Sequence, residues 1–240
     1  MALEDKDHPM ISSPQINAPR VATPSPAGGL IGQRTERLTK LKARVPKPGE
    51  ASFFFFDAHF KSEAVKILPG EYFVFDEDIL IMTTLGSCIA TCLWDRQAKV
   101  GGMNHFMLPD NTGGGIDSGR YGSFAMELLI NEMMKMGASR MTMEAKVFGG
   151  GAVISGMNTI NVGERNTAFV MDYLKTERIP VVSKDVLDVY PRKVCFLPHS
   201  GKAMVKRLAP TNPEAIIQQE RIAAQKVVPV STAGGSIDLF

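Results

Sequence analysis

The chain has 240 residues, 44% of them hydrophobic and 22% charged, a composition typical of a globular protein with a sizeable core. The net charge of only +2 and the lack of a basic block with interleaved aromatic residues argue against nucleic-acid binding, and no apolar run approaches the roughly 18 residues of a membrane span. The acidic start is not a secretory signal, and three cysteines without framework spacing favour a reducing compartment, so we expect a cytoplasmic protein without membrane insertion.

The ends of the chain differ in composition from its middle. Residues 1–50 contain a stretch rich in Pro, Ser, Ala and Gly and then a basic, helix-compatible segment. Such a composition buries too little apolar surface to offset chain entropy, so we predict a disordered tail. The basic part fits either a docking helix or a solvated linker, and its composition favours the linker. We predict one domain over residues 51–212, followed by a C-terminal helix and a loose tail over 213–240.

Strand-like segments dominate the first half of this domain. The aromatic run FFFFDAHF (53–60) is too apolar to be left in water, so we expect it to pack on the domain. Residues 71–75 are rich in β-forming side chains, and residues 79–84 form a continuous apolar run that predicts a strand buried on both faces. Residues 89–94 and 100–107 flank a charged turn and predict an antiparallel hairpin.

The second half alternates between helical and extended patterns. Apolar residues at three- and four-residue intervals predict two helices, and a triple-glycine stretch predicts a tight bend after a strand. The expected elements are a helix at 123–136, a strand at 141–148, a helix at 165–178, a strand at 179–182 and a hairpin turning at 199–201. This order predicts one α+β domain, a layered sandwich of mixed strands with flanking helices.

The residues with a claim to chemistry surround the predicted hairpin. Cys88 follows a Gly-Ser bend, and His105 follows two glycines. The two lie symmetrically about the turn, so pairing of the strands predicts that they face each other with Cβ atoms about 4.5–5.5 Å apart. A neighbouring imidazole lowers the pKa of a thiol nucleophile and later protonates the leaving group. The hydroxyls of Thr83 and Thr84, at the end of the preceding strand, are the nearest groups that could orient the imidazole.

Several other interpretations fit the same residues. A packed hairpin without chemistry is as compatible with the spacing as a Cys–His pair. Free cysteines in apolar strands are usually small core residues, which is our prediction for Cys92 and Cys195. Cys88, Cys92 and His105 could supply three zinc ligands, but the second ligand pair of a structural zinc site is not evident. The glycine stretches lack the Gly-Lys-Ser/Thr ending of a phosphate loop, so we predict neither a metal nor a cofactor.

Six segments resemble, in order, the chemoreceptor glutamine deamidases of the CheD family. They are TTLGSCIATCLWD, KVGGMNHFMLPD, RYGSFAMELLINEM, EAKVFGGGAV, VGERNTAFV and PRKVCFLPHSGKAMVK, and the resemblance runs from about Gly70 to Leu208. It implies a protein-glutamine glutaminase, an amidohydrolase that converts glutamines of methyl-accepting chemoreceptors to glutamate in chemotaxis and releases ammonia. It also implies a layered α/β fold similar to the catalytic domain of the cytotoxic necrotizing factor toxins.

The resemblance assigns roles to individual residues. The family's cysteine nucleophile falls on Cys88 and its general base on His105. The third member is a threonine a few residues before the cysteine, and the segment here is one residue shorter, so that Thr83 or Thr84 can take the position. Thr83 is our choice, because it preserves the LGSC ending. A CheC-type phosphatase is a second potential partner, and a non-catalytic adaptor, a cysteine peptidase and an acyl transferase are the competing functions.

Overall fold

The structure is a computed structural model, and it describes residues 36–108, 116–153 and 159–209 together with Gln218 and Ile222. A short helix covers residues 36–43. The strands and longer helices that follow are β1 (Phe53–Asp57), β2 (Ser62–Lys66), β3 (Tyr72–Phe75), β4 (Leu80–Leu85), β5 (Ile89–Asp95), β6 (Val100–Phe106), α2 (Ile116–Lys135), β7 (Met143–Gly149), α3 (Thr159–Thr176), β8 (Val181–Val186), β9 (Arg192–Leu197) and β10 (Lys202–Arg207). The predicted C-terminal helix lies almost entirely outside the described residues.

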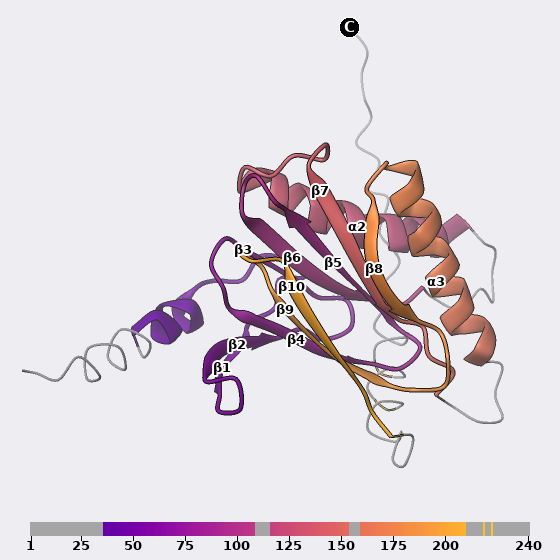
Figure 1. The fold of residues 1–240 in the computed structure, drawn as a ribbon, viewed down its shortest axis with the longest axis horizontal. Helices are drawn as coiled ribbons and strands as arrows, with labels where there is room; N and C mark the ends of the chain where they lie inside the picture. The colour runs from indigo at the N-terminus through magenta and orange to yellow at the C-terminus, as the bar shows by residue number, and fades with distance from the viewer. Residues whose placement is uncertain (1–35, 109–115, 154–158, 210–217, 219–221, 223–240) are drawn as a thin grey trace, which may run out of the picture.

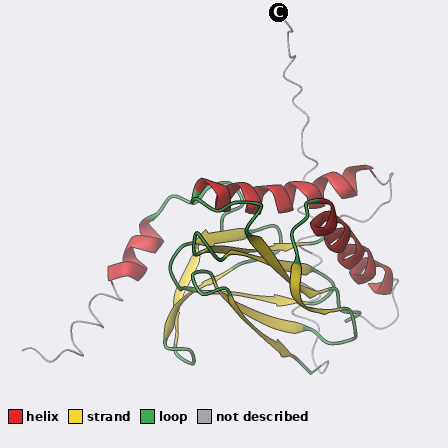
Figure 2. Ribbon diagram, turned by 45° about the horizontal axis from the view of Figure 1, so that its top comes forward, coloured by secondary structure: helices red, strands yellow, loops and turns green. Residues whose placement is uncertain are grey.

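Two five-stranded sheets and a layer of helices make up the domain (Figures 1 and 2). The outer sheet has the order β1-β2-β4-β9-β10, and the central sheet has the order β3-β6-β5-β7-β8. Both sheets are mixed, because β2 and β4 are parallel in one and β7 and β8 are parallel in the other. Parallel neighbours need a crossover connection, which α3 provides between β7 and β8. The predicted α+β sandwich of mixed strands with flanking helices is confirmed.

Two apolar layers hold the domain together. One lies between the helices and the central sheet and contains Leu93, Phe106 and Val170. The other lies between the two sheets and contains Ile81 and Phe196. Each such side chain, when fully buried, contributes about 1.5–3 kcal/mol. The strands β5 and β6 of the central sheet are therefore covered on both faces, which explains their continuous rather than alternating burial.

Buried strands and cysteines follow the predictions. The strand β4 sends Ile81 and Leu85 into the layer between the sheets and Met82 to the opposite face. Cys92 and Cys195 are free and only 1% and 4% exposed, and both belong to apolar clusters. Burial raises the pKa of both thiols, which keeps them protonated at neutral pH. Their predicted assignment as packing residues is confirmed.

The predicted boundary of the N-terminal tail at residue 50 is wrong. The helix at 36–43 packs Leu41, 4% exposed, into the layer between the sheets. Arg37 forms an ion pair of 3.0 Å with Glu63, and Lys47 pairs with Glu132 of α2. Composition averaged over fifty residues conceals this short anchored helix. The ordered domain therefore includes residues from 36 onward, and the remainder of the predicted tail lies outside the described residues.

Three further element predictions need correction. The helix α2 begins at Ile116 rather than at residue 123, and α3 begins at Thr159 rather than at 165. Gly119, Gly122 and Gly163 lie near these starts, and glycine disfavours helix in the sequence. At Gly122 a Cβ atom would lie 2.4 Å from the ring of Phe169 of α3, so a larger residue there would displace that ring. The short strand β2 went unpredicted, because its five residues carry too little pattern to stand out.

The aromatic run at 53–60 packs only in part. Phe54 is buried against Phe73 with ring centroids 5.5 Å apart, whereas Phe53, Phe56 and Phe60 are exposed by 61%, 47% and 38%. Residues 53–57 of the run form β1, the edge strand of the outer sheet, Phe60 lies in the turn that follows, and successive side chains of a strand point to opposite faces. Consecutive phenylalanines therefore cannot all reach the core.

Candidate active site

The side chains of Thr83 and His105 meet between the two sheets. Thr83 lies on β4 of the outer sheet and His105 on β6 of the central sheet, and each is 3% exposed. The Thr83 Oγ1 and His105 Nδ1 atoms are 2.8 Å apart, and the same hydroxyl donates to the carbonyl of Ile67 at 2.9 Å. The outer sheet thus fixes the orientation of an imidazole that the central sheet carries.

The sequence left two candidates for this hydroxyl, and the structure places them on opposite faces. Successive side chains alternate along a strand. Thr83 shares the inner face of β4 with Ile81 and Leu85, whereas Thr84 lies on the opposite face of the outer sheet. Thr83 is therefore the threonine that contacts His105, and its part in a reaction belongs to the proposal below.

The hydrogen bonds of Thr83 also determine the tautomer of His105. A hydroxyl has one proton, and Thr83 donates it to Ile67, so its oxygen accepts the Nδ1–H of the imidazole. The lone pair then resides on Nε2, which is buried and has no hydrogen-bond partner among the described residues. Burial lowers the pKa of His105 from 6.5 to about 3, against an opposing effect of the Ile67 carbonyl. At neutral pH the residue is an uncharged imidazole with an unused basic nitrogen.

The predicted register of the hairpin is wrong by two residues. His105 pairs with Ala90, and Ile89 pairs with Phe106, so Cys88 extrapolates to a position opposite Met107. A shift of two keeps side chains on the same face, because strands have a period of two. Cys88 and His105 are thus diagonal neighbours, for which Cα atoms are about 7–8 Å apart. Among the described residues Nε2 of His105 has no hydrogen-bond partner, so it accepts none from the Cys88 thiol.

Cys88 is fully buried at the end of a loop that several groups hold in place. The carbonyls of Gly86 and Cys88 accept hydrogen bonds from the backbone N–H groups of Gly151 and Gly150, each at 2.8 Å. Gly149 has a φ of 115°, and a Cβ atom there would lie 2.1 Å from the Cys88 carbonyl. Only glycine allows this backbone approach. The predicted glycine bend therefore packs directly against the candidate nucleophile.

Two further residues border the site and were not predicted from the sequence. Asn166 of α3 is fully buried and donates from Nδ2 to the carbonyl of Ser87 at 2.8 Å. Tyr121 of α2 lies close enough for the charge of a Cys88 thiolate, together with the larger effect of burial, to raise the pKa of its phenol. Of these two residues only Asn166 could have been noticed in the sequence, because it is a polar residue within the apolar face of a helix.

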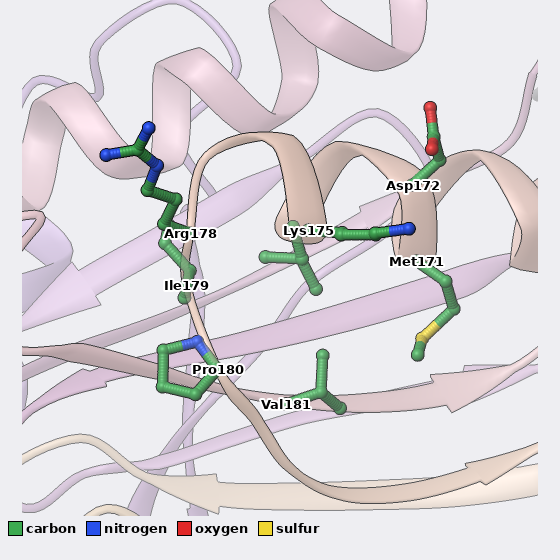
Figure 3. A pocket seen from close by; sticks show the side chains of 8 residues that line it. Met171, Asp172, Lys175, Arg178, Ile179, Pro180 and Val181 are labelled. Atoms are coloured by element: carbon green, nitrogen blue, oxygen red, sulfur yellow. The ribbon is translucent and has the colours of Figure 1, made fainter.

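Other features of the described residues lie apart from this site. A cavity of about 580 Å³ lies at the end of α3 and is lined by Met171, Asp172, Leu174, Lys175, Arg178, Ile179, Pro180 and Val181 (Figure 3). It contains none of the predicted site residues. The described ranges hold no cluster of three metal-binding side chains. Nor do they include a helix long and apolar enough to cross a membrane.

The contact between Thr83 and His105 leads to a prediction about activity. Thr83→Val removes the acceptor of the Nδ1–H, and leaving that donor unsatisfied costs about 1–3 kcal/mol, or roughly ten- to hundredfold in rate. Thr83→Ser keeps the hydroxyl and should restore most of the activity. Thr84→Val is the matched control on the opposite face and should remain active. For the deamidase activity that the resemblance to the CheD family implies, steady-state ammonia release from a chemoreceptor substrate measures all three variants, and equal losses in the two valine variants would contradict the assignment.

The chain is similar to known proteins of one family. A family model described as CheD chemotactic sensory transduction matches residues 107–207. A probable chemoreceptor glutamine deamidase CheD 1 of Albidiferax ferrireducens is 58% identical over 233 residues, covering 97% of this chain and 95% of that protein. A protein of the same description from Dechloromonas aromatica is 54% identical over 170 residues, covering 69% of this chain and 84% of the relative.

One solved structure shows a remote likeness. A hypothetical protein YfiH of Bacillus licheniformis aligns with 49% of each chain at 11% identity and a TM-score of 0.32. The Albidiferax relative, by contrast, aligns with 97% of this chain. On this similarity, the chain belongs to the CheD family.

Proposed function

We propose that this protein is a chemoreceptor glutamine deamidase that uses Cys88, His105 and Thr83. The observation that carries the proposal is the buried hydrogen bond between Thr83 and His105, which leaves Nε2 unprotonated on the face that also holds Cys88. A neutral imidazole near a thiol is the arrangement that cysteine hydrolases need. The names of the close relatives supply the substrate class, a chemoreceptor glutamine.

The reaction follows from the chemistry of these groups. Nε2 of His105 takes the thiol proton, and the Cys88 thiolate attacks the side-chain carboxamide carbon of a receptor glutamine. Backbone N–H groups around Ser87 and Cys88 stabilise the tetrahedral oxyanion. The imidazolium then protonates the departing amine, and ammonia leaves. In the second half His105 activates a water molecule, which hydrolyses the thioester and leaves a glutamate and a regenerated thiol.

Each turnover changes the receptor electrostatically. A neutral amide becomes a carboxylate, which adds one negative charge to a cytoplasmic helix and creates a methylation substrate. The proposal therefore puts the enzyme in the cytoplasm, with methyl-accepting chemoreceptors as substrates and a CheC-type phosphatase as a further partner. It also includes the assignment of the sandwich to the cysteine hydrolase fold of the cytotoxic necrotizing factor toxins.

One experiment separates the proposed function from its competitors. A receptor cytoplasmic domain is incubated with the full-length protein, and ammonia and peptide masses are measured. Deamidation releases ammonia and makes each modified peptide about 1 Da heavier at a glutamine, because water replaces the amine. A peptidase would cut the backbone, an acyl transferase would release ammonia only when an amine acceptor is present, and an adaptor would leave the receptor unchanged. Any of these three results would refute the proposal.

A further inference from the structure

Asn166 is a polar residue in the most apolar row of α3. Val162, Asn166, Val170 and Leu174 follow one another at four-residue intervals, the spacing of one helix face. Asn166, Val170 and Leu174 are all fully buried. A carboxamide in such a position destabilises the fold unless its hydrogen bonds are satisfied. A purely apolar residue would pack this row at less cost, so the amide needs an explanation.

Both ends of the amide bind backbone groups of the candidate active site. Nδ2 donates to the carbonyl of Ser87 at 2.8 Å, and Oδ1 accepts from the N–H of Leu108 at 3.0 Å. Ser87 immediately precedes Cys88, and Leu108 lies three residues beyond His105. One side chain therefore ties the loop of the nucleophile to the end of the strand that carries the base.

The first of these bonds fixes the geometry of Cys88. The Ser87–Cys88 peptide is a rigid plane, so holding its carbonyl oxygen also fixes the direction of the Cys88 N–H and the position of its Cα. The carbonyls on either side, of Gly86 and Cys88, are held by backbone N–H groups of the glycine bend. Three successive carbonyls are thus anchored, and the middle anchor is a side chain that substitution can remove.

We infer that Asn166 is a positioning residue, which holds the nucleophile loop in register with the end of the histidine strand during deamidation. The inference rests on the proposed function. Cys88 and His105 are diagonal rather than opposed, so their approach depends on where the loop places the thiol. A displacement of about 1 Å in such a pair can lower the rate a hundredfold. Substrate binding does not require the same register, so the loss should fall on kcat and not on KM.

The decisive variant is Asn166→Asp, which has nearly the same shape. Its carboxylate can still accept from Leu108 but cannot donate to Ser87, and it places a negative charge against that carbonyl. Asn166→Ala removes both bonds and serves if the aspartate variant does not fold. Val170→Ala is the matched control, since Val170 is also fully buried and lies one turn further along the same row of α3, where it packs in the apolar layer between the helices and the central sheet.

The test measures kcat and KM for deamidation of a receptor cytoplasmic domain, on full-length proteins shown to be folded by circular dichroism. We expect kcat to fall about a hundredfold in the Asn166 variants, with their KM and the kcat of the Val170→Ala control within about twofold of wild type. A folded Asn166 variant with wild-type kcat, or a loss confined to KM, would overturn the inference. A loss that merely follows the unfolded fraction would show a structural role and overturn it too. A wild-type protein that releases no ammonia would instead refute the proposed function.

Discussion

Cys88→Ala is expected to abolish ammonia release from a chemoreceptor substrate, with a loss of at least about a thousandfold in kcat. The thiolate is the atom that forms the covalent bond, and alanine offers no replacement for it. The fold should survive, because removing one sulfur atom from a buried position costs on the order of 1 kcal/mol. Peptide mass spectrometry at the substrate glutamine gives the measurement, and thermal unfolding checks the fold.

The chain contains matched controls for this substitution. Cys92→Ala removes a sulfur atom from β5, the strand that follows Cys88, at a residue that is 1% exposed. Cys195→Ala does so in the outer sheet. Both side chains belong to apolar clusters, so these variants should keep their kcat while losing similar stability. Deamidation by Cys88→Ala, or an equal loss in Cys92→Ala, would show that the nucleophile is wrongly assigned.

His105→Gln is expected to lower kcat by about a hundred- to ten-thousandfold, the usual contribution of a general acid–base group. Glutamine retains a polar side chain that can bond to Thr83 but has no basic nitrogen. Both halves of the reaction suffer, because the same imidazole protonates ammonia and activates water. Single-turnover measurements should therefore show slow formation and slow hydrolysis of the thioester. Wild-type kcat in a folded His105→Gln protein would exclude His105 as the base.

The same variant tests the protonation state of the buried imidazole. The folded-state pKa of about 3 lies below the ordinary value of 6.5, so between these values the unfolded chain binds a proton that the native state does not. Stability is therefore fully present above pH 6.5 and falls as the pH is lowered, by about 1.4 kcal/mol per unit, or about 2 kcal/mol by pH 5. Urea unfolding at pH 7 and pH 5 measures this.

Most of the shifted carboxylates titrate below this range, and Glu71, whose pKa burial raises, is present in both proteins and cancels in their difference. The pKa values of Asp95, Glu127 and Asp185 are lowered in the fold, so their contributions are lost below the ordinary values of 3.8 and 4.5. Between pH 5 and 6.5 the difference between wild type and His105→Gln isolates the imidazole. An identical pH dependence in the two proteins would mean that the histidine is not buried as a neutral group.

The sequence could predict contacts within one hairpin but not contacts between segments far apart in the chain. Cys88 and His105 were identifiable because they flank one hairpin, where the turn fixes which residues come close. The register was nevertheless wrong by two, since turn symmetry ignores the turn's own hydrogen bonds, in which Asp95 binds the N–H groups of Gln97 and Ala98. The error kept the correct face, because a shift of two preserves side-chain direction.

Long-range contacts were beyond the reach of sequence patterns. The choice between Thr83 and Thr84 depends on which face of β4 meets the central sheet, and the apolar residues around them are buried on both faces. The apolar row of α3 marked Asn166 as unusual, but its two backbone partners lie 79 and 58 residues away. Similarly, Leu41 enters the core only because its helix packs against the layer between the sheets.

The sequence by itself determined the composition class, the α+β order of elements, the strands buried on both faces and the likeness to the CheD family. These follow from local periodicity and from segments that can be compared directly. Only the tertiary structure decided which threonine meets the imidazole, how far the thiol lies from it and what holds the nucleophile loop. Those questions concern distances between segments far apart in the chain, and packing of the two sheets and α3 sets such distances.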